Sequence, residues 1–213
     1  MKFDNFIWDY DGTLFDTYDA VTRAYLRGAQ QLGIDISFAE LRWLCKHSLG
    51  WAAQQLEARF HVPQAEIIAA YSAYAPEEET MLAMQPYDGV REALAAVCAH
   101  GGRNFLYSHR DHVSIEALAH YGLKDYFSGF ITKDDHFPRK PAPDALLYLK
   151  EKHGLDPARS VMIGDRVLDV EAGLNAGMHG ALFDPEGFCG ADAPTPYRFD
   201  SMDALRLALI GKE

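Results

Sequence analysis

The stretch FIWDYDGT, residues 6–13, combines a short apolar run with two carboxylates that stand two positions apart. The apolar run indicates a buried strand of a parallel sheet, because such strands are covered on both faces. Asp9 and Asp11 then leave the carboxyl end of that strand close together, with Gly12 just beyond them. Ligands of open α/β sheets bind at this edge, where helix amino termini also favour anions. The stretch therefore predicts an α/β fold with an anion site beside Asp9.

Further apolar runs repeat this pattern along the chain. Each ends in polar residues that lead into a helical segment, and they cover residues 105–107, 127–131 and 161–163, with 181–183 as an additional strand candidate. Apolar runs that alternate with helices are typical of a doubly wound sheet. We therefore expect a Rossmann-like parallel sheet as the core of the protein.

The segment from residue 17 to residue 84 interrupts the alternation. It contains several amphipathic helical patterns and no convincing strand, and Ser37 and Glu40 have the spacing of a capping box at a helix start. A helical insertion after the first strand is the simplest explanation. We predict a catalytic core made of residues 1–16 and 85–213, with a helical cap at 17–84.

Polar residues at the ends of the predicted strands form a candidate site. Asp165 and Asp169 follow the run 161–163, and together with Asp9 they would supply the hard oxygen ligands that Mg²⁺ prefers. Ser108 follows the run 105–107 with a hydroxyl, and Lys140 precedes a helix with a compact positive charge. These five side chains predict a metal site beside an anion pocket.

Taken in order, these motifs resemble those of the haloacid dehalogenase superfamily, in the subfamily with a helical cap inserted after the first strand. The resemblance covers essentially the whole chain. Two further stretches, RKPAPD at 139–144 and DVEAGLNAG at 169–177, are similar to those of phosphoglycolate phosphatase-like members.

The resemblance implies a role for each of these residues. Asp9 would attack phosphorus, and Asp11 would protonate the leaving alcohol and then deprotonate the hydrolytic water. Mg²⁺ would be held by Asp9, the backbone carbonyl of Asp11 and Asp165, with Asp169 in support. The phosphate would be bound by Ser108, Lys140 and the amide of Gly12. The implied activity is magnesium-dependent hydrolysis of a small phosphorylated metabolite through an aspartyl-phosphate.

Three other functions remain open at this point. A dehalogenase also uses an Asp nucleophile, but it has no need of an acid, so Asp11 favours phosphoryl transfer. A sugar-phosphate mutase, similar to β-phosphoglucomutase, would share every core motif and pass the phosphoryl group to a sugar. A non-catalytic binding protein with this fold is the third alternative, although no catalytic position has been lost.

Other positions allow two interpretations. Arg166 stands where many relatives have a small hydroxyl residue, and Arg110 follows closely on Ser108, so either could bind substrate or form a structural ion pair. The segment 46–51 separates two helical patterns. It is either a helix–helix turn with Trp51 in the cap's own core, or a loop from which we expect Lys46 and His47 to bind the leaving group.

Composition limits the partners. The chain has 213 residues and a formal net charge of −11, with no basic run, which disfavours nucleic acid and anionic membranes. It contains no apolar stretch long enough for a membrane span and no signal peptide, so we expect a cytoplasmic protein. Its three cysteines lack metal-ligand spacing. A monomer or small homo-oligomer is expected.

Overall fold

The computed structural model describes residues 1–80, 82–189 and 193–211. The chain forms two compact units, Met1–Phe15 with Pro86–Glu213, and Asp16–Gln85. It passes from one unit to the other within two short strands, β2 (Phe15–Asp16) and β3 (Gln85–Pro86), which pair as a two-stranded sheet. The second unit is therefore an insertion into the first.

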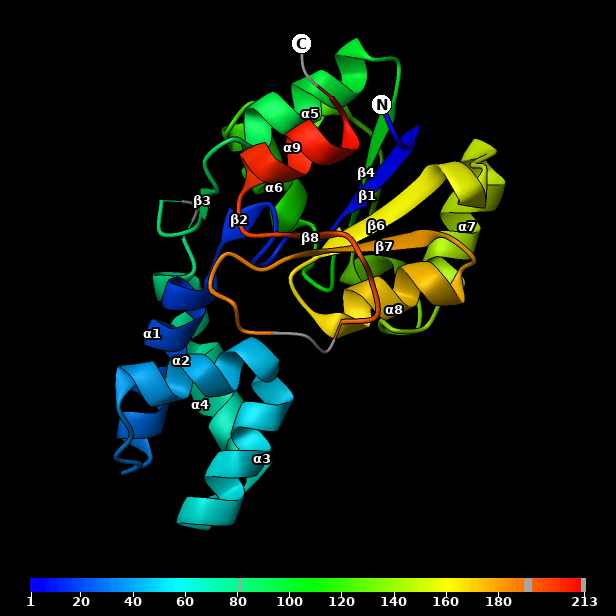
Figure 1. Ribbon diagram of the computed structural model, residues 1–213. Coiled ribbons are helices and arrows are strands. Elements are labelled where there is room, and N and C mark those ends of the chain that lie inside the picture. Colours follow the sequence, from blue (N-terminus) through cyan, green and yellow to red (C-terminus); the bar gives the residue numbers. More distant parts are fainter. Residues whose placement is uncertain (81, 190–192, 212–213) are drawn as a thin grey trace. The chain divides into compact units, whose positions relative to one another are not determined.

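A six-stranded sheet in the order β5-β4-β1-β6-β7-β8 organises the first unit (Figure 1). All its neighbouring strands pair in parallel. Its strands are β1 (Asn5–Trp8), β4 (Arg103–Tyr107), β5 (Phe127–Ile131), β6 (Ser160–Gly164), β7 (His179–Phe183) and β8 (Arg198–Phe199). The predicted parallel α/β fold is confirmed.

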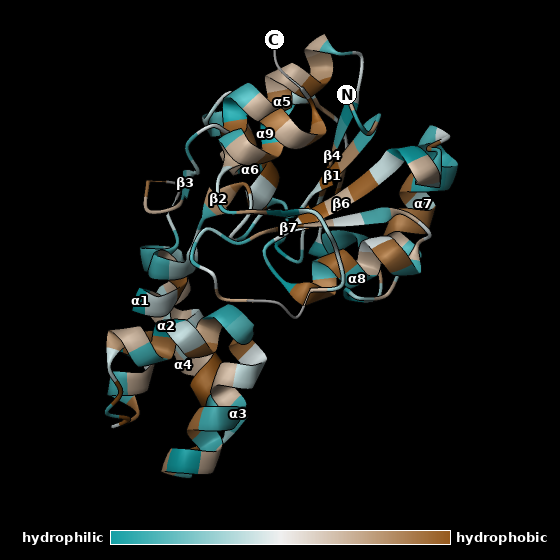
Figure 2. Cartoon of the chain, viewed as in Figure 1, coloured by the Kyte–Doolittle hydropathy of each residue, from teal (hydrophilic) through white to brown (hydrophobic). Residues whose placement is uncertain are grey.

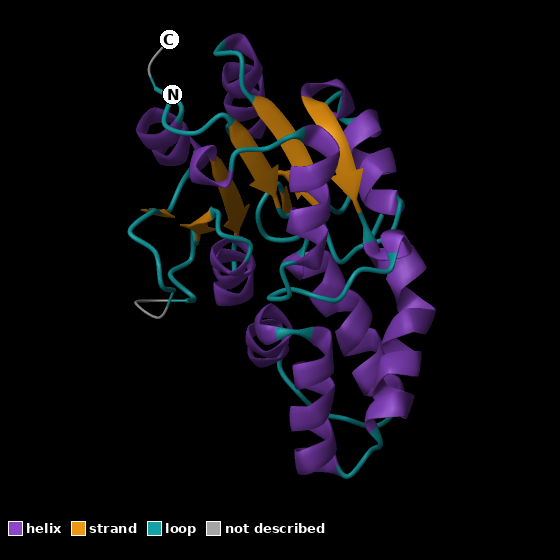
Figure 3. Ribbon diagram, turned by 90° about the vertical axis from the view of Figure 1, so that its right-hand side faces the viewer, coloured by secondary structure: helices purple, strands orange, loops and turns teal. Residues whose placement is uncertain are grey.

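The central strands are apolar on both faces because helices cover both (Figures 2 and 3). Ile7 of β1 lies in register with Phe105 and Met162, and these three pack with side chains of α7 and α8 in one core cluster. On alternate positions the indole Nε1 of Trp8 donates a hydrogen bond to the buried Asn104 Oδ1 (2.9 Å). Two-sided burial fixes the register, since a slip by one residue would exchange the faces.

The helices of the first unit connect these strands. They are α5 (Val90–Ala99), α6 (Val113–His120), α7 (Asp144–His153), α8 (Val167–Asn175) and α9 (Met202–Leu209), with the 3₁₀ turns η1 (Lys124–Tyr126), η2 (Lys133–Asp135) and η3 (Pro157–Arg159). No helix among the residues that the structure describes is long and apolar enough to cross a membrane.

The described residues of the second unit form four helices: α1 (Tyr18–Gln31), α2 (Phe38–His47), α3 (Leu49–Phe60) and α4 (Gln64–Glu78). Ser37 caps α2, since its side chain accepts a hydrogen bond from the amide of Glu40. The Glu40 carboxylate, expected to complete a capping box, pairs with Arg59 of α3 at 2.6 Å. Helices α1 and α4 approach closely at Gly28, where a Cβ would lie 2.7 Å from the backbone of α4.

The segment 46–51 contains a helix–helix turn, which was one of its two predicted forms, and not a longer loop. Lys46 and His47 form the last turn of α2, and Ser48 alone separates α2 from α3. This single residue is sufficient because its backbone is extended and its hydroxyl accepts a hydrogen bond from the amide of Trp51 (3.0 Å). One strong amino-terminal cap thus takes the place of a longer loop.

Candidate active site

Asp9 is held at the carboxyl end of the central strand. Its amide donates to the carbonyl of Ile163 (2.8 Å), so its backbone continues the pairing of β1 with β6. Its side chain is buried, and Oδ1 accepts a hydrogen bond from the amide of Tyr10 (2.8 Å). Among the described residues no hydrogen-bond partner faces Oδ2. Asp9 is therefore an oriented carboxylate with one oxygen left for another group.

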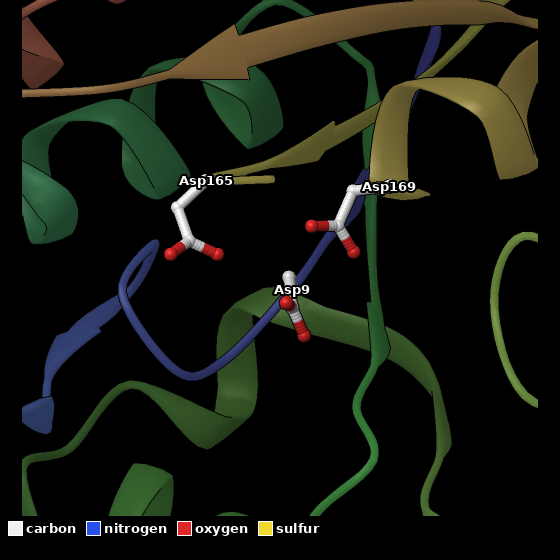
Figure 4. A group of neighbouring side chains, drawn as sticks. All are labelled: Asp9, Asp165 and Asp169. Carbon is white, nitrogen blue, oxygen red and sulfur yellow. The ribbon is translucent and has the colours of Figure 1, made fainter. Parts of the chain in front are cut away.

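Two further carboxylates join Asp9 from the next strand and helix. Asp165 directly follows β6, and Asp169 lies in the first turn of α8, where its Oδ2 accepts a hydrogen bond from the amide of Arg166 (3.1 Å). One carboxylate oxygen from each of Asp9, Asp165 and Asp169 lies within 4.8 Å of the others (Figure 4). The structure thus brings together three of the predicted site residues.

Gly164 makes room for this arrangement. A Cβ at position 164 would lie 2.2 Å from Cβ and Cγ of Asp169. Real side-chain atoms do not approach so closely, so the carboxylate of Asp169 occupies space that any other residue at 164 would fill.

Lys140 connects two of the carboxylates. Its Nζ lies 2.9 Å from Oδ1 of Asp9 and 2.8 Å from Oδ1 of Asp169, and its side chain is completely buried. A buried ammonium is tolerated when opposite charges compensate its lost hydration. Lys140 therefore lies inside the site beside two of the predicted carboxylates, and its role in binding an anion stays a prediction.

The charges in this cluster shift one another's titration. Burial alone would lower the pKa of Lys140, but the carboxylates of Asp169 and Asp9 outweigh it and raise that pKa. Burial raises the pKa of Asp9 to about 6 against the opposing effect of Lys140. For Asp169, Lys140 and Arg166 outweigh burial, and its pKa is lowered. Burial thus disfavours the ionised form of Asp9, and an additional positive charge nearby would stabilise it.

Arg166 brings a second cation close to these carboxylates. Its Nη2 lies 3.8 Å from Oδ2 of Asp9, and its Nε lies 3.7 Å from Oδ1 of Asp165. The sequence left open whether Arg166 binds substrate or forms an ion pair, and in this structure it contacts two site carboxylates.

Asp11 and Ser108 are oriented through Arg110. The guanidinium donates to Asp11 Oδ1 from Nη2 at 2.7 Å and from Nε at 3.1 Å. The amide of Arg110 donates to Oγ of the buried Ser108 (3.0 Å), whose own amide pairs with Ile131. Arg110 therefore contacts both Asp11, two residues after Asp9, and Ser108, the residue directly after β4.

Gly12 adopts a positive φ of 71°, which favours glycine, in the turn after Asp11. Its amide donates to the carbonyl of Phe15 (2.8 Å) within the same turn. Phosphate binding by this amide, as the sequence predicts, would require that hydrogen bond to open or to be shared.

The two predicted cap residues lie in the second unit, at the end of α2. Lys46 is buried with Nζ 5.3 Å from the ring centroid of Tyr18. His47 packs between two tryptophans, with ring centroids 4.6 Å from Trp43 and 4.1 Å from Trp51. Burial lowers the pKa of His47. His47 is thus part of an aromatic cluster on α2 and α3.

The sequence places His109 between Ser108 and Arg110 as a possible cation and indicates no contact for it. In the structure its Nε2 accepts a hydrogen bond from the backbone amide of Lys140 (3.0 Å). Burial and the neighbouring Lys140 lower the pKa of His109 to about 3, so the ring is neutral. No local pattern indicates this contact, because 31 positions separate the two residues.

The carboxylate cluster has the properties of a divalent-cation site. Carboxylate oxygens are the ligands that Mg²⁺ prefers, and three buried ones converge here. The pKa of Asp9 is raised, and its Oδ2 has no hydrogen-bond partner among the described residues and only Arg166 Nη2 at 3.8 Å, which indicates a position where a metal ion would stabilise negative charge. The residues present fit such an ion.

Known proteins resemble this chain over most of its length. The model of a family described as haloacid dehalogenase-like hydrolase matches residues 6–183. Phosphoglycolate phosphatase from Aquifex aeolicus is 24% identical over 179 residues, covering 83% of this chain and 82% of that protein. N-acetylmuramic acid 6-phosphate phosphatase from Pseudomonas aeruginosa is 28% identical over an alignment of 225 residues, covering 98% and 97%.

A solved structure resembles the chain as well. The crystal structure of a hydrolase from Streptococcus pneumoniae TIGR4 has a TM-score of 0.65 and 31% sequence identity, and the match covers 86% of this chain and 94% of that one.

Proposed function

Because the chain belongs to the haloacid dehalogenase-like hydrolase family, we propose that it hydrolyses the phosphate monoester of a small metabolite, with Asp9 as nucleophile. The observation that carries this proposal is the state of the Asp9 carboxylate. Lys140 holds Oδ1, and Oδ2 has no hydrogen-bond partner among the described residues. A carboxylate oriented in this way is a suitable nucleophile for phosphorus.

The reaction proceeds in two displacements. In the first, an oxygen of Asp9 forms a bond to phosphorus while the bond from phosphorus to the ester oxygen breaks, and Asp11 gives its proton to the departing alcohol. In the second, Asp11 takes a proton from water, whose oxygen attacks phosphorus as the bond to Asp9 breaks. Inorganic phosphate leaves, and both side chains return to their starting states.

The chain's own cations and hydroxyls support the transferring group. Phosphoryl transfer depends mainly on alignment and on neutralisation of the phosphoryl oxygens. Lys140 and Ser108 are the proposed phosphate ligands, with the Gly12 amide as a further one. The buried side chain of Lys140 and its contact with Asp9 support this assignment.

We infer that Mg²⁺ is the cofactor. Asp9, Asp165 and the backbone carbonyl of Asp11 would hold it, and Asp169 would support the site by orienting Lys140 and the start of α8. When bound, the ion supplies positive charge for the phosphoryl oxygens. The convergence of three buried carboxylates supports this inference.

The leaving group is proposed only as a class. Two relatives are named for phosphoglycolate and for N-acetylmuramic acid 6-phosphate, whose alcohols differ greatly in size. Small phosphorylated metabolites are the class that contains both. Lys46 and His47 remain our proposed contacts for the part of the substrate that does not react.

The test is release of inorganic phosphate from a panel that includes both named compounds, with Mg²⁺ or with EDTA. We expect magnesium-dependent release, and Asp9→Asn should abolish it while the protein remains folded, as judged by circular dichroism. Conversion of a phosphosugar to an isomer without phosphate release would instead assign a mutase. Phosphate release by Asp9→Asn at a tenth of the wild-type rate would contradict the proposed nucleophile.

A further inference from the structure

Lys140 is held by its backbone as well as by its side chain. Its amide donates to Nε2 of His109 at 3.0 Å, and its Nζ contacts Asp9 and Asp169. His109 is the second residue after β4, whereas Lys140 lies between η2 and α7 in the irregular segment 136–143. The hydrogen bond therefore joins the loop at the end of a central strand to a segment that belongs to no helix or strand.

Other side chains hold the same segment at neighbouring points. Tyr107 donates from its hydroxyl to the carbonyl of Pro138 (3.4 Å), and Asn175 donates from Nδ2 to the carbonyl of Pro141 (2.9 Å). These two contacts hold the backbone two residues before Lys140 and one residue after it. The bond from His109 is made with the backbone of Lys140 itself.

The position of this backbone determines what Lys140 can reach. A lysine carries its charge on a flexible four-carbon stem, so its ammonium is only as well placed as the backbone from which it extends. The Nζ of Lys140 lies within 3 Å of two carboxylates from different elements. A shift of about 1 Å in a positioning group is enough to reduce catalysis severely.

The ring of His109 must be neutral to make this contact. Because Nε2 accepts a hydrogen bond, the proton lies on Nδ1, and a second proton on Nε2 would oppose the Lys140 amide. Burial, the Lys140 ammonium and the guanidinium groups of Arg139 and Arg166 all disfavour a positive ring, against a smaller effect of Asp169. Nη2 of Arg139 lies 3.4 Å from Nδ1, and because both groups are donors in this tautomer, the contact is the close approach of a cation and not a hydrogen bond. The surrounding cations thus maintain the acceptor.

We propose that His109 is a positioning residue, which places Lys140 for phosphate binding by accepting the hydrogen bond of its backbone amide. The proposal rests on the proposed function, because that function makes Lys140 a phosphate ligand. It adds a third role to the tripeptide after β4, in which Ser108 is the proposed phosphate ligand and Arg110 contacts Asp11.

The test compares His109→Gln with His109→Leu. Glutamine places an amide oxygen at about the reach of Nε2, whereas leucine fills similar space without an acceptor. Binding of inorganic phosphate is measured by titration calorimetry with Mg²⁺ present. We expect the dissociation constant to rise about tenfold in His109→Leu, or about 1.4 kcal/mol, and to stay within about threefold of wild type in His109→Gln.

A double-mutant cycle separates positioning from a general structural role. In a Lys140→Met background the His109→Leu change should alter phosphate binding less than about twofold, because the group that it positions is gone. Equal losses in the Gln and Leu variants, or an undiminished loss without Lys140, would overturn the proposal.

Two controls keep the outcome interpretable. If His109→Leu fails to fold, His109→Asn replaces it, since the shorter amide is polar but cannot reach the Lys140 amide. A wild-type protein that neither binds phosphate nor hydrolyses esters would contradict the proposed function. A wild-type protein that does both, with a Leu variant that binds phosphate normally, would contradict the His109 proposal alone.

Discussion

Arg110 and Asp11 form a two-pronged ion pair across 99 positions of sequence, with Nη2 and Nε of the guanidinium at 2.7 and 3.1 Å from one carboxylate oxygen. Both side chains are largely shielded from solvent, at 16% and 29% exposure. Nε also lies 3.4 Å from the second carboxylate oxygen, and these contacts restrain the direction of the carboxylate as well as its charge. The side chain proposed as acid and base is thus oriented by a residue from the loop that follows β4.

Arg110→Met should therefore lower kcat/KM for a phosphate ester by about tenfold, or about 1.4 kcal/mol, because Asp11 loses its orientation. Arg110→Lys should fall between that variant and wild type, since an ammonium keeps the charge without the fork. Arg159→Met, which removes an exposed pair with Asp4, is the matched control. Activity of Arg110→Met above half of wild type would mean that Asp11 is oriented without it.

Asp11→Asn should be impaired most with poor leaving groups. An alkyl ester needs a proton as it departs, whereas an activated aryl ester needs little help. We expect the loss of kcat on an alkyl phosphate to exceed the loss on a nitrophenyl phosphate by about tenfold or more. Equal losses on both esters would rule out Asp11 as the acid.

Mg²⁺ should stabilise the folded protein as well as activate it. An ion that binds only the native state at a hundred times its dissociation constant adds about 2.7 kcal/mol to the free energy of unfolding. The unfolding temperature of wild type should rise with added Mg²⁺ and fall back with EDTA. The Asp165→Asn variant should respond much less, while the exposed Asp35→Asn should respond as wild type does. An unchanged response in Asp165→Asn would remove that residue from the site.

His109 should make the stability of the metal-free protein depend on pH. The unfolded ring titrates near its ordinary value of 6.5, whereas the folded ring has a pKa of about 3. Between pH 6.5 and pH 3 the unfolded state therefore binds a proton on His109 that the folded state does not bind. The contribution of His109 is complete above pH 6.5 and is lost progressively toward pH 3, by at most about 1.4 kcal/mol per pH unit.

Urea unfolding at pH 7 and pH 5 measures this effect. His109→Gln should lose less stability than wild type over that interval, because glutamine does not titrate. Identical losses in the two proteins would show that the ring is not kept neutral by its surroundings.

His47→Ala should change substrate preference if the end of α2 contacts the leaving group. We expect kcat/KM for the best metabolite to fall about tenfold and that for a small aryl phosphate to fall much less. Trp43→Phe, which keeps an aromatic ring beside His47, serves as control for the cluster. Lys46→Ala is a poorer test, since this buried residue also packs over Tyr18. A parallel fall on both substrates would indicate damage to the helix.

Much of the fold could be predicted because its signals are local. The apolar runs before Asp9, Ser108 and Asp165 correspond to β1, β4 and β6, and the family resemblance and the α/β sheet are confirmed. Two-residue strands such as β8 carry no periodicity and could not be predicted. Of the two interpretations of segment 46–51, the helix–helix turn is the one that the structure shows, since Ser48 alone separates α2 from α3 and Trp51 packs against the core of the second unit.

Some contacts within the candidate site could not be predicted from the sequence, for a different reason. The identities of Asp9, Ser108 and Lys140 follow from what each residue type can do at a strand end or helix start. The contacts of Arg110 with Asp11, and of His109 with Lys140, depend on the meeting of segments that are distant in sequence. The charge neighbourhood that keeps His109 neutral also exists only once these segments have folded together.

Gly164 shows how selection can constrain a position that has no chemistry of its own. Asp169 Cβ lies 2.2 Å from where the methyl group of an alanine at 164 would stand, and Lys140 contacts the same aspartate. In a library of random variants, the smallest possible addition at this position would therefore be eliminated along with losses of the aspartate itself. A glycine beside a reactive cluster can thus be as invariant under selection as the groups that react.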